Sequence, residues 1–231
     1  MLRAMSSRPL PDLFRAAVPV CAPTPALPPR SEEARLLETL LAPVCGAARA
    51  PAVAARLLAA FGGLAGVVAA PEARLQTVAG WDRRAAAQIK AVEAVALRLA
   101  RAPLLDRPVL SCWDALLAYL RASLAHGGTE RMRVLFLDRR NALIADEEVA
   151  VGTVDHVPVY PREVVRRALE LDASALILAH NHPSGDPAPS ESDRAMTEAV
   201  RDAAAVLGLA LHDHVIVGRG REVSFRALGL L

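Results

Sequence analysis

The sequence predicts an α/β protein in which a mixed sheet is flanked by helices and preceded by a small all-α segment. From residue 109 onward, short apolar runs of strand length alternate with longer stretches of helical periodicity, as in a sheet covered by helices. Residues 35–102 show helical periodicity alone, and residues 1–34 are rich in proline. We therefore expect a flexible tail over 1–34, a helical domain over 35–102 and an α/β domain over 109–231.

The helical domain is predicted from apolar stripes and from the residues that bound them. Ser31 followed by two glutamates is a plausible helix start, and Gly62-Gly63 ends a later helix. The expected helices begin at residue 31 and then cover 51–61, 64–70, 71–78 and 83–102. A tight turn separates the last two.

The α/β domain follows a linker over 103–108. It should open with a helix over 111–124, and the remaining elements alternate in type. We expect strands near 132–138, 142–146, 149–153, 175–179, 209–217 and 222–226, with helices over 162–171 and 190–207.

The segment HNHPSGDPAPSESD, residues 180–193, concentrates metal-binding side chains. His180 and His182 follow an apolar strand, and because side chains alternate along a strand, both imidazoles project to the same side. The Pro/Gly-rich stretch after them reverses the chain. Ser190 then starts a helix that brings Asp193 back one turn later.

Two histidines and one carboxylate, with water in the fourth position, form an open zinc site of the catalytic kind. Zinc in such a site lowers the pKa of its water to about 7 and polarises a substrate carbonyl. A nearby carboxylate is still needed to accept the proton, and a donor such as Ser190 could face the developing oxyanion.

A purely structural interpretation also fits parts of this segment. Ser190-x-x-Asp193 is a capping box, in which a hydroxyl and a carboxylate satisfy amides at a helix start without any metal. An isolated His-x-His on a strand is often incidental. The combination of both patterns at this spacing favours the metal site.

The residues from Val159 to Asp193 resemble the bacterial RadC family of the JAMM/MPN metalloprotease superfamily, whose signature is HxH, seven residues, then SxxD. The similarity extends over about residues 104–231. It implies an MPN fold, one zinc ion per chain held by His180, His182 and Asp193, and cleavage of a peptide or isopeptide bond.

In that superfamily an upstream glutamate hydrogen-bonds the zinc-bound water just before the first strand of the domain. The resemblance thus makes Glu130 the base, and Ser190 the second catalytic residue. From the sequence alone Glu147, Glu148 and Glu163 are alternatives. The first two lie in a charged run that suggests a solvated turn, and Glu163 suits a helix start.

Other histidines fit structural positions better than ligand positions. A second HxH, His212 and His214, lies in a late strand with no Ser-x-x-Asp after it. We interpret His214 as a strand histidine or as one that supports the ligands from behind. His126 and His156 are expected at the surface or in loops.

The short helices around residues 78–83 resemble the helix-hairpin-helix module that accompanies the MPN domain in RadC proteins. There, a Gly-x-Gly turn holds a DNA phosphate with backbone amides. This chain has Gly80-Trp81-Asp82, so an aspartate occupies the place of the second glycine, where it could instead cap the next helix. DNA binding through residues 35–102 and a purely structural module are therefore both open.

Charge and cysteine content set the remaining bounds. Residues 35–102 hold nine basic and four acidic side chains (net +5), whereas residues 103–231 hold fourteen and eighteen (net −4), so nucleic-acid affinity is expected in the helical part. The three cysteines have no zinc-finger spacing, and no run suits a membrane span or a secretory signal. We expect a cytoplasmic protein without a membrane partner.

Three functions follow as hypotheses. The first is a zinc-dependent hydrolase that acts on a peptide or protein substrate. The second is a DNA-repair or recombination accessory protein that binds DNA through its helical part. The third is a domain that binds metal or partners without turnover, although such a scaffold has no need of the complete set of site residues.

Overall fold

The computed structural model describes residues 31–78, 83–105, 107–152 and 159–231. The Gly80-Trp81-Asp82 turn, His156 and nearly all of the predicted tail lie outside the described residues, so the expectations for them stay predictions. The division into regions 1–34, 35–102 and 109–231 also stays a prediction. In the described part of the chain, no helix combines the length and apolar character needed to cross a membrane.

The N-terminal region is helical, as expected. Its helices are α1 (Glu32–Cys45), α2 (Ala50–Phe61), α3 (Leu64–Ala69), α4 (Glu72–Leu75) and α5 (Arg83–Arg101), and a 3-10 turn (Ala102–Leu104) follows. They enclose a core of their own, which includes Leu37, Leu41, Leu57, Leu75 and Ile89. The fourth helix is shorter than the 71–78 predicted. Lys90, the only lysine, donates to the Val68 and Ala70 carbonyls at the end of α3.

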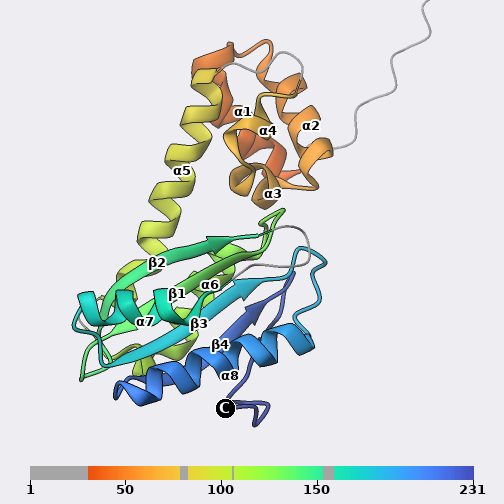
Figure 1. Cartoon of the computed structure of the whole chain (residues 1–231). Coiled ribbons are helices and arrows are strands. Elements are labelled where there is room, and N and C mark those ends of the chain that lie inside the picture. The colour runs from red at the N-terminus through yellow and green to blue at the C-terminus, as the bar shows by residue number, and fades with distance from the viewer. Residues whose placement is uncertain (1–30, 79–82, 106, 153–158) are drawn as a thin grey trace, which may run out of the picture. The chain divides into compact units, whose positions relative to one another are not determined.

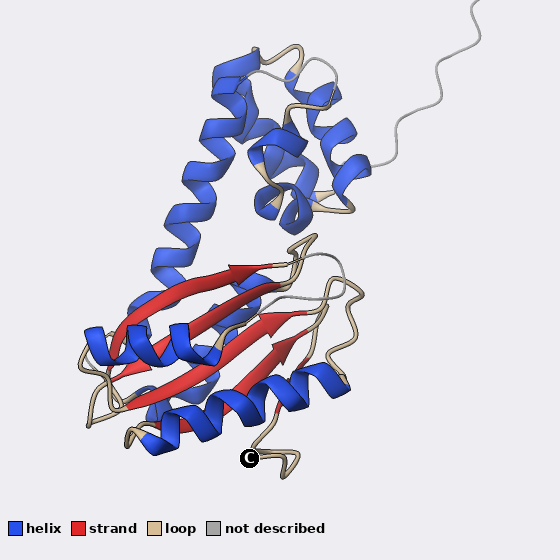
Figure 2. Cartoon of the chain, viewed as in Figure 1, coloured by secondary structure: helices blue, strands red, loops and turns tan. Residues whose placement is uncertain are grey.

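The C-terminal region contains one mixed sheet, which Figure 2 shows in red between helices. Its strands are β1 (Arg131–Leu137), β2 (Leu143–Val151), β3 (Ala175–Asn181), β4 (Ala210–Val217) and β5 (Glu222–Ser224), in the order β2-β1-β3-β4-β5. The β3–β4 pair is parallel and the other pairs are antiparallel. This confirms the predicted mixed sheet.

Strand β2 corrects the sequence prediction. Two strands over 142–146 and 149–153, with Glu147 and Glu148 in a turn between them, were expected, but a single strand crosses the acidic run. The acidic side chains can stay in the sheet because each meets an arginine: the pairs are Asp146–Arg133, Glu147–Arg167 and Glu148–Arg131. Irregular register at two points lets the long strand follow β1.

Helices cover both faces of the sheet (Figure 1). α7 (Pro161–Glu170) and α8 (Glu191–Val206) pack on one face, where Met132, Val134, Leu176 and Leu178 form a buried core with them. α6 (Trp113–Leu124), which starts after a 3-10 turn (Val109–Cys112) rather than at Ser111, covers the other face over Leu135, Ile177 and Val215. Every residue of β3 is buried, so the side chains at its end are held from both sides.

Candidate metal centre

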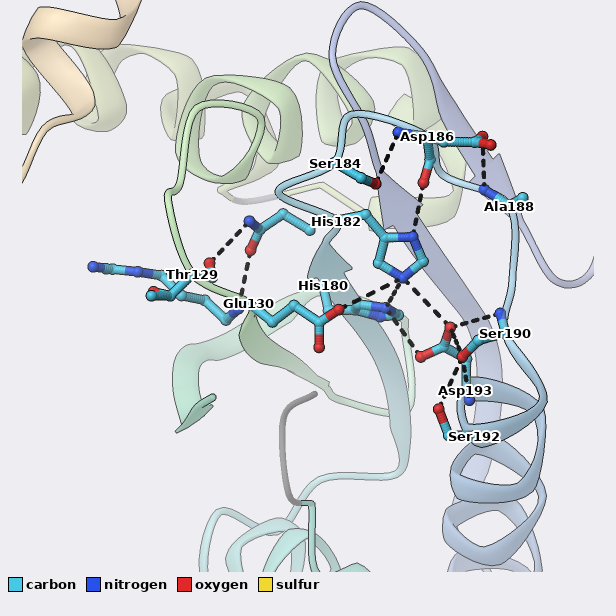
Figure 3. A network of polar contacts seen from close by, with 12 residues as sticks. Thr129, Glu130, His180, His182, Ser184, Asp186, Ala188, Ser190, Ser192 and Asp193 are labelled. Carbon is cyan, nitrogen blue, oxygen red and sulfur yellow. Dashed lines mark hydrogen bonds and ion pairs between the residues drawn. The ribbon is translucent and has the colours of Figure 1, made fainter. Parts of the chain in front are cut away.

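The structure brings His180, His182 and Asp193 together at the carboxyl end of β3 (Figure 3). The Nε2 atoms of the two histidines are 3.0 Å apart. Asp193 Oδ1 lies 3.2 Å from His180 Nε2, and Asp193 Oδ2 lies 3.4 Å from His182 Nε2. Donor atoms around a tetrahedral zinc ion with bonds of about 2.0–2.1 Å stand about 3.3–3.4 Å apart. The three side chains therefore have the spacing of a metal site.

Alternation along β3 sets the direction of both imidazoles. His180 lies in the strand, and His182 follows its last residue but continues the ladder, because its N–H donates to Val217 O at 3.0 Å. The loop after it turns at Gly185, which has a φ of 91°. A Cβ on Gly218 would stand 2.4 Å from the Gly185 carbonyl oxygen, so this loop packs directly on the end of β4.

Ser190 and Asp193 form the capping box expected from the sequence. Ser190 is the N-cap of α8; its Oγ accepts from Asp193 N at 3.1 Å, and Asp193 Oδ2 accepts from Ser190 N at 2.8 Å. The Ser190 hydroxyl also donates to Asp193 Oδ2 at 2.6 Å. The structural and the metal-binding interpretations are thus compatible, because the same carboxylate caps the helix and faces the histidines.

The Asp193 carboxylate is kept ionised. Burial alone would raise its pKa, but its contacts with His180 and His182 and the hydrogen bond from Ser190 hold that pKa well below its usual range. The ionised carboxylate is the form that binds a cation.

The hydrogen-bond network assigns the tautomer of His182 directly. Its Nδ1 lies 2.8 Å from Asp186 O, and a carbonyl oxygen can only accept. The proton of the neutral ring therefore sits on Nδ1, and the lone pair of Nε2 faces His180 and Asp193.

A buried chain of hydrogen bonds assigns the tautomer of His180. Thr197 Oγ1 donates to Asp193 O at 2.5 Å, so its hydroxyl must accept from His214 Nδ1 at 2.7 Å. Burial lowers the pKa of His214 well below its usual range, so this ring is neutral. Its Nε2 must accept from His180 Nδ1 at 2.8 Å, which leaves the His180 Nε2 lone pair free.

When both rings are neutral, two Nε2 lone pairs face each other at 3.0 Å beside an ionised carboxylate. Lone pairs at this distance repel each other unless a proton or a cation lies between them. Two imidazole nitrogens and a carboxylate are a donor set that zinc accepts. The residues present therefore fit the metal that the sequence predicts.

Glu130 is the upstream glutamate that lies at the site. Its side chain is buried, its Oε1 is 4.0 Å from His182 Nε2, and in Figure 3 it extends towards the histidine rings. The register of β1 on β3, with Met132 opposite His180, places Glu130 opposite His182 when it is continued by two residues. The alternatives are engaged elsewhere, with Glu147 on Arg167, Glu148 on Arg131 and Glu163 on Arg166.

Two positions around the site had no assigned role in the sequence. Thr197 follows Asp193 by one helical turn, a spacing that could have suggested a contact behind the site. Asn181, between the two histidines, points to the opposite face of the sheet and holds the segment that contains Glu130. His214 lies directly behind His180, as its interpretation as a supporting histidine requires, whereas His212 contacts Asn141 instead.

A mixed sheet between helices, with paired histidines at a strand end and an aspartate in the first turn of the next helix, defines a JAB/MPN domain. Residues 110–230 match the family model described as a RadC-like JAB domain. The chain is 64% identical over 179 residues to a UPF0758 protein of Rhodobacter capsulatus, covering 78% of this chain and 84% of that protein. It is 58% identical over 175 residues to a UPF0758 protein of Ruegeria pomeroyi, covering 76% and 78%. The chain belongs to the RadC family.

Proposed function

We propose that this protein is a zinc-dependent hydrolase that cleaves a peptide or isopeptide bond with water. The observation that carries the proposal is that the Nε2 atoms of His180 and His182 and the carboxylate of Asp193 converge on one point at the spacing of metal ligands. Two histidines with a purely structural role do not require their Nε2 atoms and a carboxylate to converge, whereas the binding of a metal ion does. The buried carboxylate of Glu130 at the same point supplies the base that hydrolysis requires.

Zinc held by His180, His182 and Asp193 would lower the pKa of its water to about 7 and polarise the substrate carbonyl. Glu130 would accept the proton of the attacking water and return it to the leaving amine. Ser190 would donate its hydroxyl proton to the developing oxyanion. In the structure that proton points to Asp193, so the hydroxyl would turn towards the substrate during the reaction.

The metal is tested first. Purified protein should contain about one zinc ion per chain by elemental mass spectrometry, and the double variant His180→Ala/His182→Ala should contain none while remaining folded. A folded wild-type protein that takes up no zinc would overturn the proposal.

Turnover is tested with Glu130→Gln, which keeps the shape of the side chain but removes the base. Zinc content should stay at the wild-type level, while cleavage of a peptide or isopeptide library should fall by at least about 10²-fold. Equal activity in both proteins would remove Glu130 from the mechanism. Zinc binding without cleavage in either protein would indicate a metal-binding scaffold.

We also propose, as a second function, that the helical part binds DNA. Residues 35–102 carry a net charge of +5, and Arg83 and Arg84 are exposed at the start of α5. The full chain should bind duplex DNA with an affinity that falls steeply between about 50 and 200 mM salt. The variant Arg83→Gln/Arg84→Gln should bind more weakly and with a smaller salt dependence. Absence of binding at low salt would overturn this proposal.

A further inference from the structure

Asn181 stands between the two histidines in sequence but on the opposite face of the sheet. Alternation along β3 turns its side chain away from His180 and His182 and towards the segment that joins α6 to β1. The residue is 1% exposed. A buried carboxamide needs partners for its two N–H donors and its oxygen.

Those partners lie on both sides of Glu130. Asn181 Nδ2 donates to Thr129 O at 3.0 Å and makes a longer contact with Gly127 O at 3.4 Å. Asn181 Oδ1 accepts from Arg131 N at 3.0 Å. The side chain therefore fixes the peptide groups immediately before and after Glu130.

The surrounding backbone completes this arrangement. Glu130 O accepts from Gly152 N at 2.9 Å, which fixes the glutamate from the side of β2. A Cβ on Gly127 would stand 3.0 Å from Asn181 Nδ2, so a glycine gives the carboxamide room at this position. With its backbone held at three points, Glu130 directs its carboxylate to the position 4.0 Å from His182 Nε2.

We propose that Asn181 is a positioning residue that holds Glu130 over the metal position. The proposal rests on the function proposed above for Glu130. Glu130 lies just outside β1, where the sheet ladder alone does not fix it, and a misplacement of about 1 Å at a reacting group can cost about 10²-fold in rate. The three residues 180–182 would thus supply two metal ligands on one face and the support for the base on the other.

The first test measures amide hydrogen exchange in the metal-free protein by NMR. Asn181→Ala should increase the exchange rate of the Arg131 amide at least about tenfold, because that amide loses its acceptor, while amides within β1 keep their protection. Gly127→Ala, whose methyl group presses on the Asn181 amide, should act in the same direction. Gln88→Ala is the matched control, since it removes another carboxamide bond to a distant carbonyl (Leu40 O, 2.8 Å).

The second test reads the position of the Glu130 carboxylate. Co²⁺ added to protein with ¹³C-labelled glutamate should broaden the Glu130 carboxyl signal, which Glu130→Gln identifies by its disappearance. Asn181→Ala should reduce this broadening while the Co²⁺ affinity stays within about threefold of wild type, because the three ligands are untouched. A role limited to folding would leave the broadening unchanged.

Unchanged Arg131 exchange, or unchanged Glu130 broadening, in folded Asn181→Ala would overturn the proposal. If Asn181→Ala does not fold, Gly127→Ala decides by the same two readouts. A wild-type protein that binds no Co²⁺ would overturn the metal site instead, and the positioning role would then be decided by Arg131 exchange alone.

Discussion

Replacing Thr197 with valine should weaken metal binding although Thr197 is not a ligand. The hydroxyl of Thr197 accepts from His214 Nδ1 and thereby keeps the proton of His214 away from His180. Valine has nearly the same shape but cannot accept. In the metal-free variant His214 is free to move its proton to Nε2, which places a proton on His180 Nε2, where Asp193 Oδ1 at 3.2 Å accepts it.

The loss of metal affinity is set by the cost of reversing this tautomer change before the metal can bind. To free His180 Nε2, the variant has to return the proton of His214 to Nδ1, where it faces a methyl group in a fully buried site. A buried donor without an acceptor costs about 1–3 kcal/mol. That cost corresponds to an affinity about 5–150-fold weaker, in the range found when partners of metal-bound histidines are removed.

The assay is competition for Zn²⁺ against a chromophoric chelator. Thr39→Val is the matched control, because the Thr39 hydroxyl also donates to the carbonyl four residues earlier (Arg35 O, 2.9 Å) but lies exposed on α1. Wild type and Thr39→Val should bind equally well. A Thr197→Val affinity within about twofold of theirs, in a folded protein, would refute the tautomer reasoning.

Three other outcomes are expected. The hydrogen bond to Asp193 raises the pKa of His182, so protons compete with the metal for this ring. Zinc affinity should therefore fall by up to about tenfold per pH unit below that pKa. A flat affinity profile from pH 8 to 5, measured by chelator competition, would contradict this. Tyr119→Phe should lower the free energy of unfolding in urea by about 1.5–3 kcal/mol, because Tyr119 donates to the buried Asp146 carboxylate; a loss under about 0.5 kcal/mol would count against it. In Gly218→Ala the added methyl group would stand 2.4 Å from Gly185 O, and overpacking of this kind costs about 1–3 kcal/mol. Each kcal/mol should lower Tm by about 2–4 °C. An unchanged Tm would show that the loop moves aside without cost.

The sequence predicted that His180, His182 and Asp193 would lie together because the geometry of this cluster is local. Strand alternation places His180 and His182 together, and one capping box places Asp193, so three side chains within fourteen residues need little tertiary information. Glu130 was different. Its position depends on β1 pairing with β3, a contact across fifty residues of sequence that only the family resemblance suggested.

The acidic run of β2 shows where residue patterns mislead. Three consecutive acidic residues favour a turn when judged alone, since nothing nearby in sequence neutralises them. In the fold Asp146, Glu147 and Glu148 meet arginines from β1 and α7, and pairing across the sheet outweighs the local preference. The contacts of Asn181 and Thr197 were equally hidden, because both depend on which main-chain groups the fold brings beside them.

The double use of the Asp193 carboxylate affects how mutants at this position are to be understood. The same two oxygens start α8 and face the metal position, so Asp193→Ala would remove a ligand and also fray the helix, at about 0.5–2 kcal/mol for the lost cap. Asp193→Asn retains an oxygen that can accept from Ser190 N while removing the negative charge. The difference between these two variants, rather than either alone, separates cation loading from helix initiation. Because the helix start and a bound cation would share one carboxylate, we expect metal uptake and the order of the first turn of α8 to rise and fall together.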